Sequence, residues 1–162
     1  MSRPSLAPAL TRTLEGATRV VVLGVGSELR ADDAAGLRAA ERLRRMRLPG
    51  VQVLQGGTAP ENVTGEIRRL SPSHLLIIDA ADMGLPPGTI QVLRQDELGG
   101  SKPGTHGISL AVLLQYLSQD MSFQAIVVGI QPSSLEAGAP ISAPVNEAVE
   151  EVARAVQQAL GR

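Results

Sequence analysis

Three acidic residues and one histidine stand where their side chains could meet and hold a metal ion. Asp32 and Asp33 follow a glycine-ended apolar run, Asp79 closes another apolar run, and His106 lies in a Gly-rich loop. Two carboxylates and one imidazole favour a divalent ion of borderline hardness and leave coordination positions open. Zinc sites usually take more nitrogen or sulfur, and a dedicated magnesium site would not need histidine.

Each of these residues also has a purely structural interpretation. Asp32 stands where a helical pattern begins, and we interpret it as an N-cap that accepts backbone N–H groups. Asp33 gains little more from capping and is expected to point into a cleft. Asp79 closes a buried run, where desolvating a carboxylate is costly without a partner. The alternative for Asp79 is that backbone donors of the adjoining turn hold it.

The two histidines are expected to differ. His74 precedes a strand at its amino end, away from the expected cleft, and is predicted to be a surface residue. His106 is delivered by the loop 95–107 to the start of a helix. A lone loop histidine is usually exposed, so the interest of His106 depends on Asp33 and Asp79 lying nearby.

The glycines at the end of the first run resemble a dinucleotide-binding loop, but the pattern is incomplete. The third glycine of G-x-G-x-x-G is replaced by Leu29, and the next strand ends in Gln55 rather than in an acid for the ribose. Two acids at the helix start would also repel a pyrophosphate. Gly24 and Gly26 are therefore expected only to turn the chain tightly.

The elements that must position these residues alternate along the chain. Apolar, β-branched runs predict strands over residues 20–26, 51–57, 75–80, 89–94 and 123–130. Helical patterns cover residues 33–46, 60–70, 108–119 and 144–160. The alternation predicts an α/β fold, a three-layer α/β/α sandwich, with functional groups beyond the carboxyl ends of the strands.

Two details of the sheet can be predicted. Residues 51–57 alternate more than the other runs, which places them nearer an edge. Only a short, turn-rich stretch separates residues 75–80 from 89–94, too short for a helical crossover. The strand 89–94 is therefore expected to run antiparallel.

Composition excludes several classes of protein. The 162 residues suit one domain, and the net charge of −1 without a basic face makes nucleic acid an unexpected partner. The absence of cysteine excludes disulfides, thiolate metal sites and thiol nucleophiles. No apolar run approaches the ~20 residues of a membrane span, so no membrane partner and a soluble, cytoplasmic protein are expected. Residues 1–18 do not read as a signal peptide and are expected to be an N-terminal extension before a single domain over 19–162. Within this extension Leu6, Leu10 and Leu14 recur at i, i+4, which predicts a short helix or a frayed tail with helical tendency.

At these residues the sequence resembles a known family. The stretches "LGVGSELRADDAAG", "GGTAPEN", "LLIIDAADMGLPPGTI", "THGISL" and "VVGIQP" are similar to those of [NiFe]-hydrogenase maturation endopeptidases, most closely the hydrogenase 3 type that serves formate hydrogenlyase. The resemblance implies a phosphorylase/hydrolase-like mixed five-stranded sheet of order 2-1-3-5-4 with strand 4 antiparallel. It also implies that Asp33, Asp79 and His106 coordinate metal and that Asp33 and Asp79 are catalytic. Gly56, Gly57 and Thr58, after the second strand, are expected to contact substrate.

The implied activity is removal of a C-terminal extension from the precursor of the hydrogenase large subunit after nickel insertion. The nickel would belong to the substrate, and the free enzyme could be metal-free. Metal could polarise the scissile carbonyl or activate a water, or an aspartate could act as general base as in an aspartic-type endopeptidase; both mechanisms stay open. A protease that docks one large precursor has no need to oligomerise, so a monomer is expected.

Two departures from the family and two competing hypotheses remain. Ser27 stands where family members commonly have Asn, and Gln55 where they usually have an acid; neither is an expected ligand. A non-catalytic α/β ligand-binding or regulatory module could use the same cleft, with the acids as replaceable caps. A small-molecule hydrolase of similar fold is the third hypothesis.

Overall fold

The computed structural model describes residues 5–93 and 107–161, and five strands within them form one mixed sheet. The sheet has the order β2-β1-β3-β5-β4. Its strands are β1 (Val20–Val25), β2 (Val51–Gly57), β3 (His74–Ala80), β4 (Ile90–Leu93) and β5 (Gln124–Ile130). All neighbours pair in parallel except β4, which runs antiparallel to β5. The predicted order, the edge position of β2 and the antiparallel β4 are confirmed.

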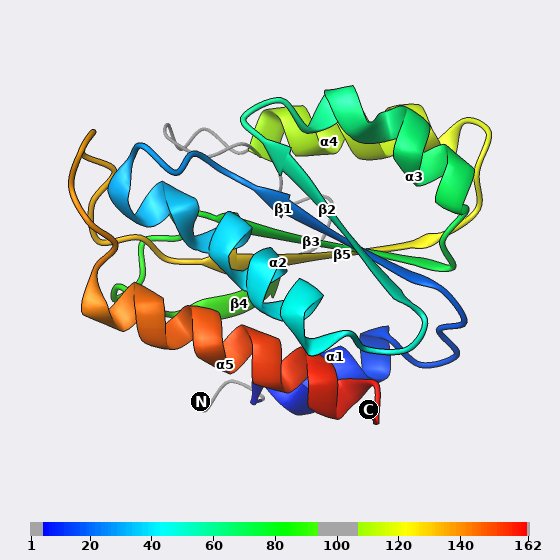
Figure 1. Ribbon diagram of the computed structural model, residues 1–162, viewed down its shortest axis with the longest axis horizontal. Helices are drawn as coiled ribbons and strands as arrows, with labels where there is room; N and C mark the ends of the chain where they lie inside the picture. The colour runs from blue at the N-terminus through cyan, green and yellow to red at the C-terminus, as the bar shows by residue number, and fades with distance from the viewer. Residues whose placement is uncertain (1–4, 94–106, 162) are drawn as a thin grey trace.

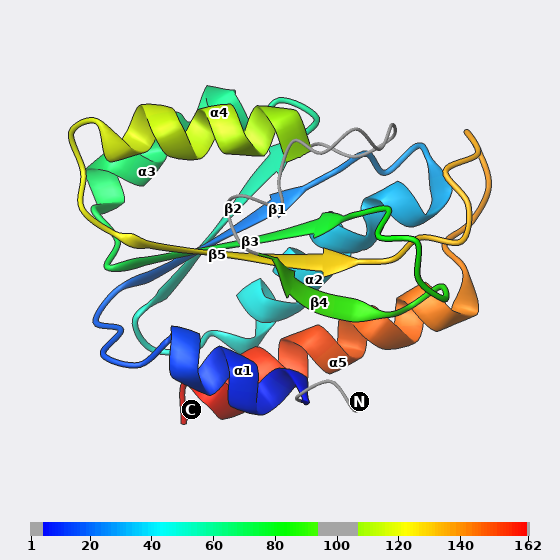
Figure 2. The ribbon, with the colours of Figure 1, turned by 180° about the vertical axis from the view of Figure 1, so that it is seen from behind.

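Helices cover both faces of this sheet, so the predicted three-layer sandwich is confirmed. One face carries α1 (Leu6–Thr13), α2 (Ala35–Met46) and α5 (Ala143–Ala159), and the other carries α3 (Thr64–Leu70) and α4 (Gly107–Ser118) (Figures 1 and 2). Short 3-10 turns, η1 (Ala31–Ala34) and η2 (Pro60–Val63), precede α2 and α3. In the described chain no helix is both long and apolar enough to cross a membrane.

Alternation along the central strands divides the core into two halves. Even-numbered residues such as Val22, Leu76 and Val128 pack with α1, α2 and α5. Odd-numbered residues such as Leu23 and Ile77 pack with α3 and α4. This is the period-2 pattern of a strand buried on both sides. Each buried aliphatic side chain stabilises the folded state by about 1.5–3 kcal/mol. The strands that end at the candidate site are therefore held firmly in the core.

The segment before β1 packs as part of the fold. Leu10 and Leu14 are buried in the same core half as α2 and α5, and α1 contacts both α5 and β4. The i, i+4 spacing of these leucines predicted the helix, and the buried face explains why it is ordered. Of the two expectations for this segment, the short helix is the one found.

The prediction that His74 is a surface residue is wrong. His74 is the first residue of β3 and is buried, because the chain between α1 and β1 folds over it. Its Nδ1 lies 2.9 Å from Ser73 Oγ, which also accepts the N–H groups of Thr18 and Arg19. Burial lowers the pKa of His74 below its ordinary value, against an opposing hydrogen bond with the backbone of Glu15.

Candidate functional site

The candidate site lies at the carboxyl ends of the parallel strands. Asp33 stands in η1, the first element after β1, Asp79 is the second-last residue of β3, and Gly56 and Gly57 close β2. Thr58 follows them and is exposed. The remaining residue predicted for the site, His106, lies outside the described residues. The helix that follows it, α4, begins at Gly107 on this side of the sheet (Figure 1).

Gly36 explains how the elements that carry the two aspartates are packed together. A Cβ at Gly36 would lie 2.1 Å from the carbonyl oxygen of Ile78 and 2.4 Å from that of Val25. The first turn of α2 therefore rests directly on the ends of β3 and β1, an approach that no side chain would allow. Asp33 precedes Gly36 by three residues and Asp79 follows Ile78 by one, so this contact brings their two elements together. The D-D-x-x-G spacing is the sequence form of this packing.

The backbone of Asp33 is held from the other side by Gly26 and Ser27. The Ser27 N–H donates to the carbonyl oxygen of Asp33 at 3.2 Å. A Cβ at Gly26, whose φ is 145°, would lie 1.9 Å from that oxygen. The Gly26 N–H in turn donates to the carbonyl oxygen of Gly57 at 3.0 Å. One backbone network thus joins the ends of β1 and β2 to the turn that carries Asp33.

Both candidate carboxylates are withdrawn from solvent. Asp33 is 2% exposed and Asp79 is 3% exposed. Burying a carboxylate is unfavourable unless hydrogen bonds, ion pairs or a cation stabilise its charge, and carboxylate oxygens are also ligands that divalent cations accept. Among the described residues there is no group of three His, Cys, Asp or Glu side chains that could hold a metal ion. A three-ligand site would need a residue outside them, where His106 is found.

The prediction that Asp32 is a helix N-cap is wrong. The residue at the N-cap position of η1 is Arg30, and no side chain caps this turn. The Asp32 carboxylate points instead to the loop between β5 and α5. It accepts the N–H groups of Ser133 at 2.8 Å, Ser134 at 3.2 Å and Ser142 at 2.7 Å, and the Ser142 hydroxyl at 2.8 Å. Asp32 therefore fastens this loop to the turn that carries Asp33.

These hydrogen bonds decide the charge state of Asp32. Burial raises the pKa of this carboxyl, but the hydrogen bonds from Ser142, Ser133 and Ser134 outweigh burial and lower the pKa below its ordinary value of 3.8. Asp32 is accordingly ionised at neutral pH. The hydrogen bonds of this carboxylate go to the loop between β5 and α5.

Gln131 is a second buried polar residue at this edge, and its role was not predicted. Its Oε1 accepts the N–H groups of Met83 at 2.6 Å and Leu85 at 3.3 Å, and its Nε2 donates to Asp82 Oδ1 at 3.3 Å. The side chain thus holds the loop after β3 against the end of β5. The only signal in the sequence was the stretch "VVGIQP", which contains it.

Gln55, the departure from the family's usual acid, makes a hydrogen bond that an ionised acid could not make. Its Nε2 donates to the carbonyl oxygen of Leu37 at 2.9 Å, linking β2 to α2. Its Oε1 would lie 2.5 Å from a Cβ at Gly24, so the amide occupies the space that this glycine leaves. In this chain the position serves packing between strand and helix.

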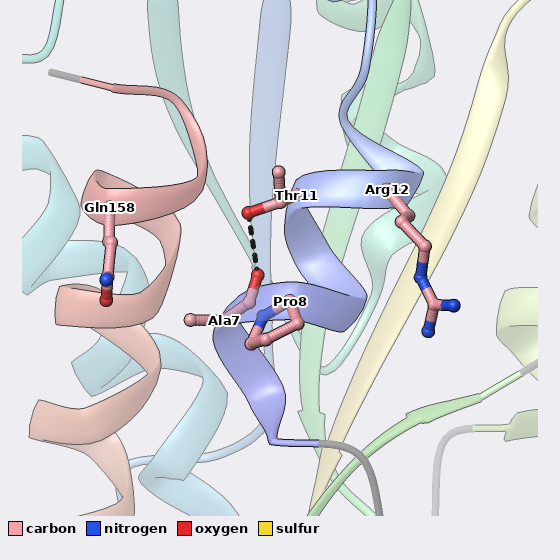
Figure 3. Close-up of a pocket in the computed structure, with 5 residues that line it drawn as sticks. All are labelled: Ala7, Pro8, Thr11, Arg12 and Gln158. Carbon is pink, nitrogen blue, oxygen red and sulfur yellow. Dashed lines mark hydrogen bonds between the residues drawn. The ribbon is translucent and has the colours of Figure 1, made fainter.

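Surface depressions in the described part of the chain also lie near α1, at the opposite end of the sheet. One of them, with a volume of about 620 Å³, is lined by Ala7, Pro8, Thr11, Arg12 and Gln158. Figure 3 shows that Arg12 points away from Gln158 and that the Thr11 hydroxyl donates to the carbonyl oxygen of Ala7, at 2.8 Å. These side chains do not converge on a common point, so this depression has no arrangement for chemistry.

Comparison of the sequence with known protein families shows what kind of protein has this site. The family described as hydrogenase maturation protease matches residues 37–159. The chain belongs to the hydrogenase maturation protease family. It is therefore a hydrolase of the peptidase class, and the predicted family and enzyme class are confirmed.

Individual proteins of similar sequence or structure are also hydrogenase maturation proteases. This protease is 38% identical to the hydrogenase 3 maturation protease of Escherichia coli K12 over 133 residues, which span 82% of this chain and 85% of that one. A [NiFe] hydrogenase maturation protease from Thermococcus kodakarensis superimposes with a TM-score of 0.86 at 28% identity, covering 95% of this chain and 99% of that one. A hydrogenase maturating endopeptidase of E. coli gives a TM-score of 0.76 at 32% identity, with 88% and 92% covered.

Proposed function

We propose that this protease removes the C-terminal extension from the large-subunit precursor of a [NiFe]-hydrogenase after nickel has been inserted. The observation that carries the proposal is the seating of Gly36 on the carbonyl oxygens of Ile78 and Val25, because it places Asp33 and Asp79 at one edge of the sheet. The names of the relatives support the substrate class. Nickel is cargo of the substrate in this proposal, and the protease recognises it through Asp33, Asp79 and His106.

The buried carboxylates suit this recognition. Carboxylate oxygens are ligands that divalent transition-metal ions accept, so a substrate-bound nickel ion at the carboxyl ends of β1 and β3 can bind Asp33 and Asp79. By strand alternation Asp79 belongs to the face covered by α3 and α4, and α4 follows His106 directly. An imidazole delivered at the start of α4 would approach Asp79 from that face. The three ligands would come from η1, β3 and the segment before α4.

Hydrolysis of the scissile amide requires a group that moves one proton. A water oxygen bonds to the carbonyl carbon while a carboxylate accepts the water's proton, and the C–N bond breaks as that proton passes to the departing amine. Asp33 and Asp79 are the groups of this chain proposed for the transfer. The nickel ion fixes the tail beside them and can polarise the carbonyl.

The dependence on nickel tests this proposal. Purified nickel-loaded and nickel-free precursor are incubated with the wild-type protease, and the intact mass of the precursor is followed. We expect loss of the C-terminal extension only from the nickel-loaded precursor. Cleavage of both forms at the same rate would contradict nickel recognition, and cleavage of neither would contradict the substrate assignment.

The same experiment distinguishes the proposed protease from the competing hypothesis of a non-catalytic binding module. A module using this cleft would bind a ligand and leave the precursor intact. Family membership favours the peptidase, so cleavage of the precursor is the expected result.

A further inference from the structure

Leu29 is an exposed apolar side chain next to the candidate site. It is 77% exposed, compared with 60% for Val112 and 50% for Tyr116, the other large hydrophobic residues exposed in the described chain. Single exposed leucines are common on protein surfaces and need no function. Leu29 differs from such residues in how its backbone is held and in where it stands.

The backbone of Leu29 is fixed by hydrogen bonds on both sides. Its N–H donates to Ser27 Oγ at 3.2 Å, and its carbonyl oxygen accepts the N–H of Gly138 at 2.9 Å. The neighbouring Arg30 Nε donates to the carbonyl oxygen of Leu135 at 3.3 Å. A side chain presented on a fixed backbone loses less conformational entropy on binding than one on a mobile loop.

Asp32 connects these contacts into one unit. Its carboxylate accepts four hydrogen bonds from Ser133, Ser134 and Ser142, and its own N–H donates to the carbonyl oxygen of Ser134 at 3.1 Å. Residues 27–34 and 133–142, joined through Asp32, are called the Asp32 platform below. The platform projects Leu29 outward and carries Asp33 at its inner end.

The place of Leu29 relative to Asp33 indicates that the protein substrate is the partner that binds this surface. Leu29 precedes Asp33 by four residues, and the Ser27 N–H in the same loop holds the carbonyl oxygen of Asp33. Because Leu29 and Asp33 belong to one hydrogen-bonded loop, a folded protein that brings its tail to Asp33 would have its own surface close to Leu29. Of the exposed apolar residues on α4, Tyr116 already packs against Arg68, which lies 4.6 Å from its ring centroid.

We propose that Leu29 is a docking anchor that inserts into an apolar depression on the folded precursor beside its C-terminal tail, and that Asp32 is the positioning residue that holds this anchor and Asp33 in one unit. The proposal rests on the proposed function and adds the surface by which the substrate is selected. Its partner is a folded protein, and a short peptide copy of the tail would not reach Leu29. Leu29 accordingly contributes to affinity for the precursor and not to the bond-breaking step.

Replacement of Leu29 tests the anchor. Leu29→Ser, Leu29→Met and the matched control Val112→Ser, which removes an exposed apolar side chain from α4, are assayed with nickel-loaded precursor over a range of concentrations. We expect Leu29→Ser to raise KM about tenfold, as truncation of an interface anchor does, with Leu29→Met recovering most of the affinity. Val112→Ser is expected to leave KM within twofold of the wild type. An unchanged KM for Leu29→Ser, or a larger rise for Val112→Ser, overturns the proposal.

Direct binding separates this inference from the proposed function. The affinity of each immobilised variant for the precursor is measured in parallel with cleavage. Precursor that binds the wild type without being cleaved contradicts the proposed function, and the comparison with Leu29→Ser still decides the anchor. Equal binding by Leu29→Ser and the wild type overturns the anchor even where cleavage is efficient.

Discussion

Gly36 lies so close to Ile78 that a Cβ on the glycine would come within 2.1 Å of the Ile78 carbonyl oxygen. Through this one contact the start of α2 takes its position from the end of β3. Asp33 belongs to the turn before α2 and Asp79 to the end of β3, so the contact sets their relative position. The candidate site is therefore a product of helix-to-sheet packing as much as of its acids.

Substituting Gly36 should disturb both stability and site. In Gly36→Ala the added methyl group would collide with two backbone carbonyl oxygens that cannot move aside, at a cost of about 1–3 kcal/mol in the free energy of unfolding. The control is Gly65→Ala in α3, where a Cβ meets nothing within 4 Å and alanine should stabilise the helix by about 0.5–1 kcal/mol. Urea unfolding of both variants measures this. Equal stability of the two variants would refute the packing argument.

Asp32 should stabilise the fold in a pH-dependent way. In the native state its pKa is lowered below 3.8 by the hydrogen bonds from Ser142, Ser133 and Ser134, which outweigh burial. This stabilisation is fully present when the pH is above the pKa that Asp32 has in the unfolded chain. It is lost as the pH falls through the lower pKa of Asp32 in the folded protein. Asp32→Asn should cost about 2–3 kcal/mol at pH 7, and the difference from the wild type should shrink towards pH 3. A difference that stays constant from pH 7 to pH 3 would contradict this role.

The sequence was sufficient for the sheet but not for the contacts of the polar residues. Apolar runs and their connection lengths predicted all five strands found in the described residues, and the short link before Ile90 predicted the antiparallel β4. The role of Asp32 could not be seen, because its partner Ser142 lies 110 residues away and no local pattern records such a pairing. A cap was the nearest interpretation available to a rule that uses only neighbouring residues.

Gln131 should respond to a nearly isosteric change of charge. Gln131→Glu keeps an acceptor for the N–H groups of Met83 and Leu85 but places a second carboxylate against Asp82 Oδ1, which is 3.3 Å from Nε2 in the native protein. We expect a loss of about 2 kcal/mol at pH 7 that is partly recovered in acid, where a protonated glutamic acid can donate to Asp82. Thermal melts at pH 7 and pH 4.5 test this. A melting temperature equal to that of the wild type at both pH values would show that the side chain is dispensable.

His74 should make the fold sensitive to mild acid. Its pKa in the folded protein is lowered below 6.5 because burial disfavours the charged imidazole. The unfolded chain therefore takes up the proton first, and stability falls as pH drops from about 6.5 through the lower folded pKa. His74→Gln should lose less stability than the wild type between pH 7.5 and pH 5, measured as the difference between their urea midpoints. Parallel pH curves for the two proteins would contradict the assignment.

His74 also shows why burial was misjudged from sequence. Its place before an apolar run indicated a surface loop, but the strand begins at His74 itself and the chain after α1 covers it. The amphipathic spacing of Leu10 and Leu14 predicted a helix without indicating where it would pack. Coverage by a distant segment is decided by tertiary packing, which the residues around His74 do not encode.

The central claim is that Asp33 and Asp79 act together on the precursor, and cleavage by their amide variants tests it most directly. Nickel-loaded precursor is incubated with the wild type, Asp33→Asn, Asp79→Asn and the exposed control Glu151→Gln on α5, and the intact mass of the product is recorded with time. We predict loss of the C-terminal extension with the wild type and Glu151→Gln, and a rate at least 100-fold lower, on the order expected for loss of a general base, with either aspartate variant. Cleavage by Asp33→Asn or Asp79→Asn at the wild-type rate would contradict the account.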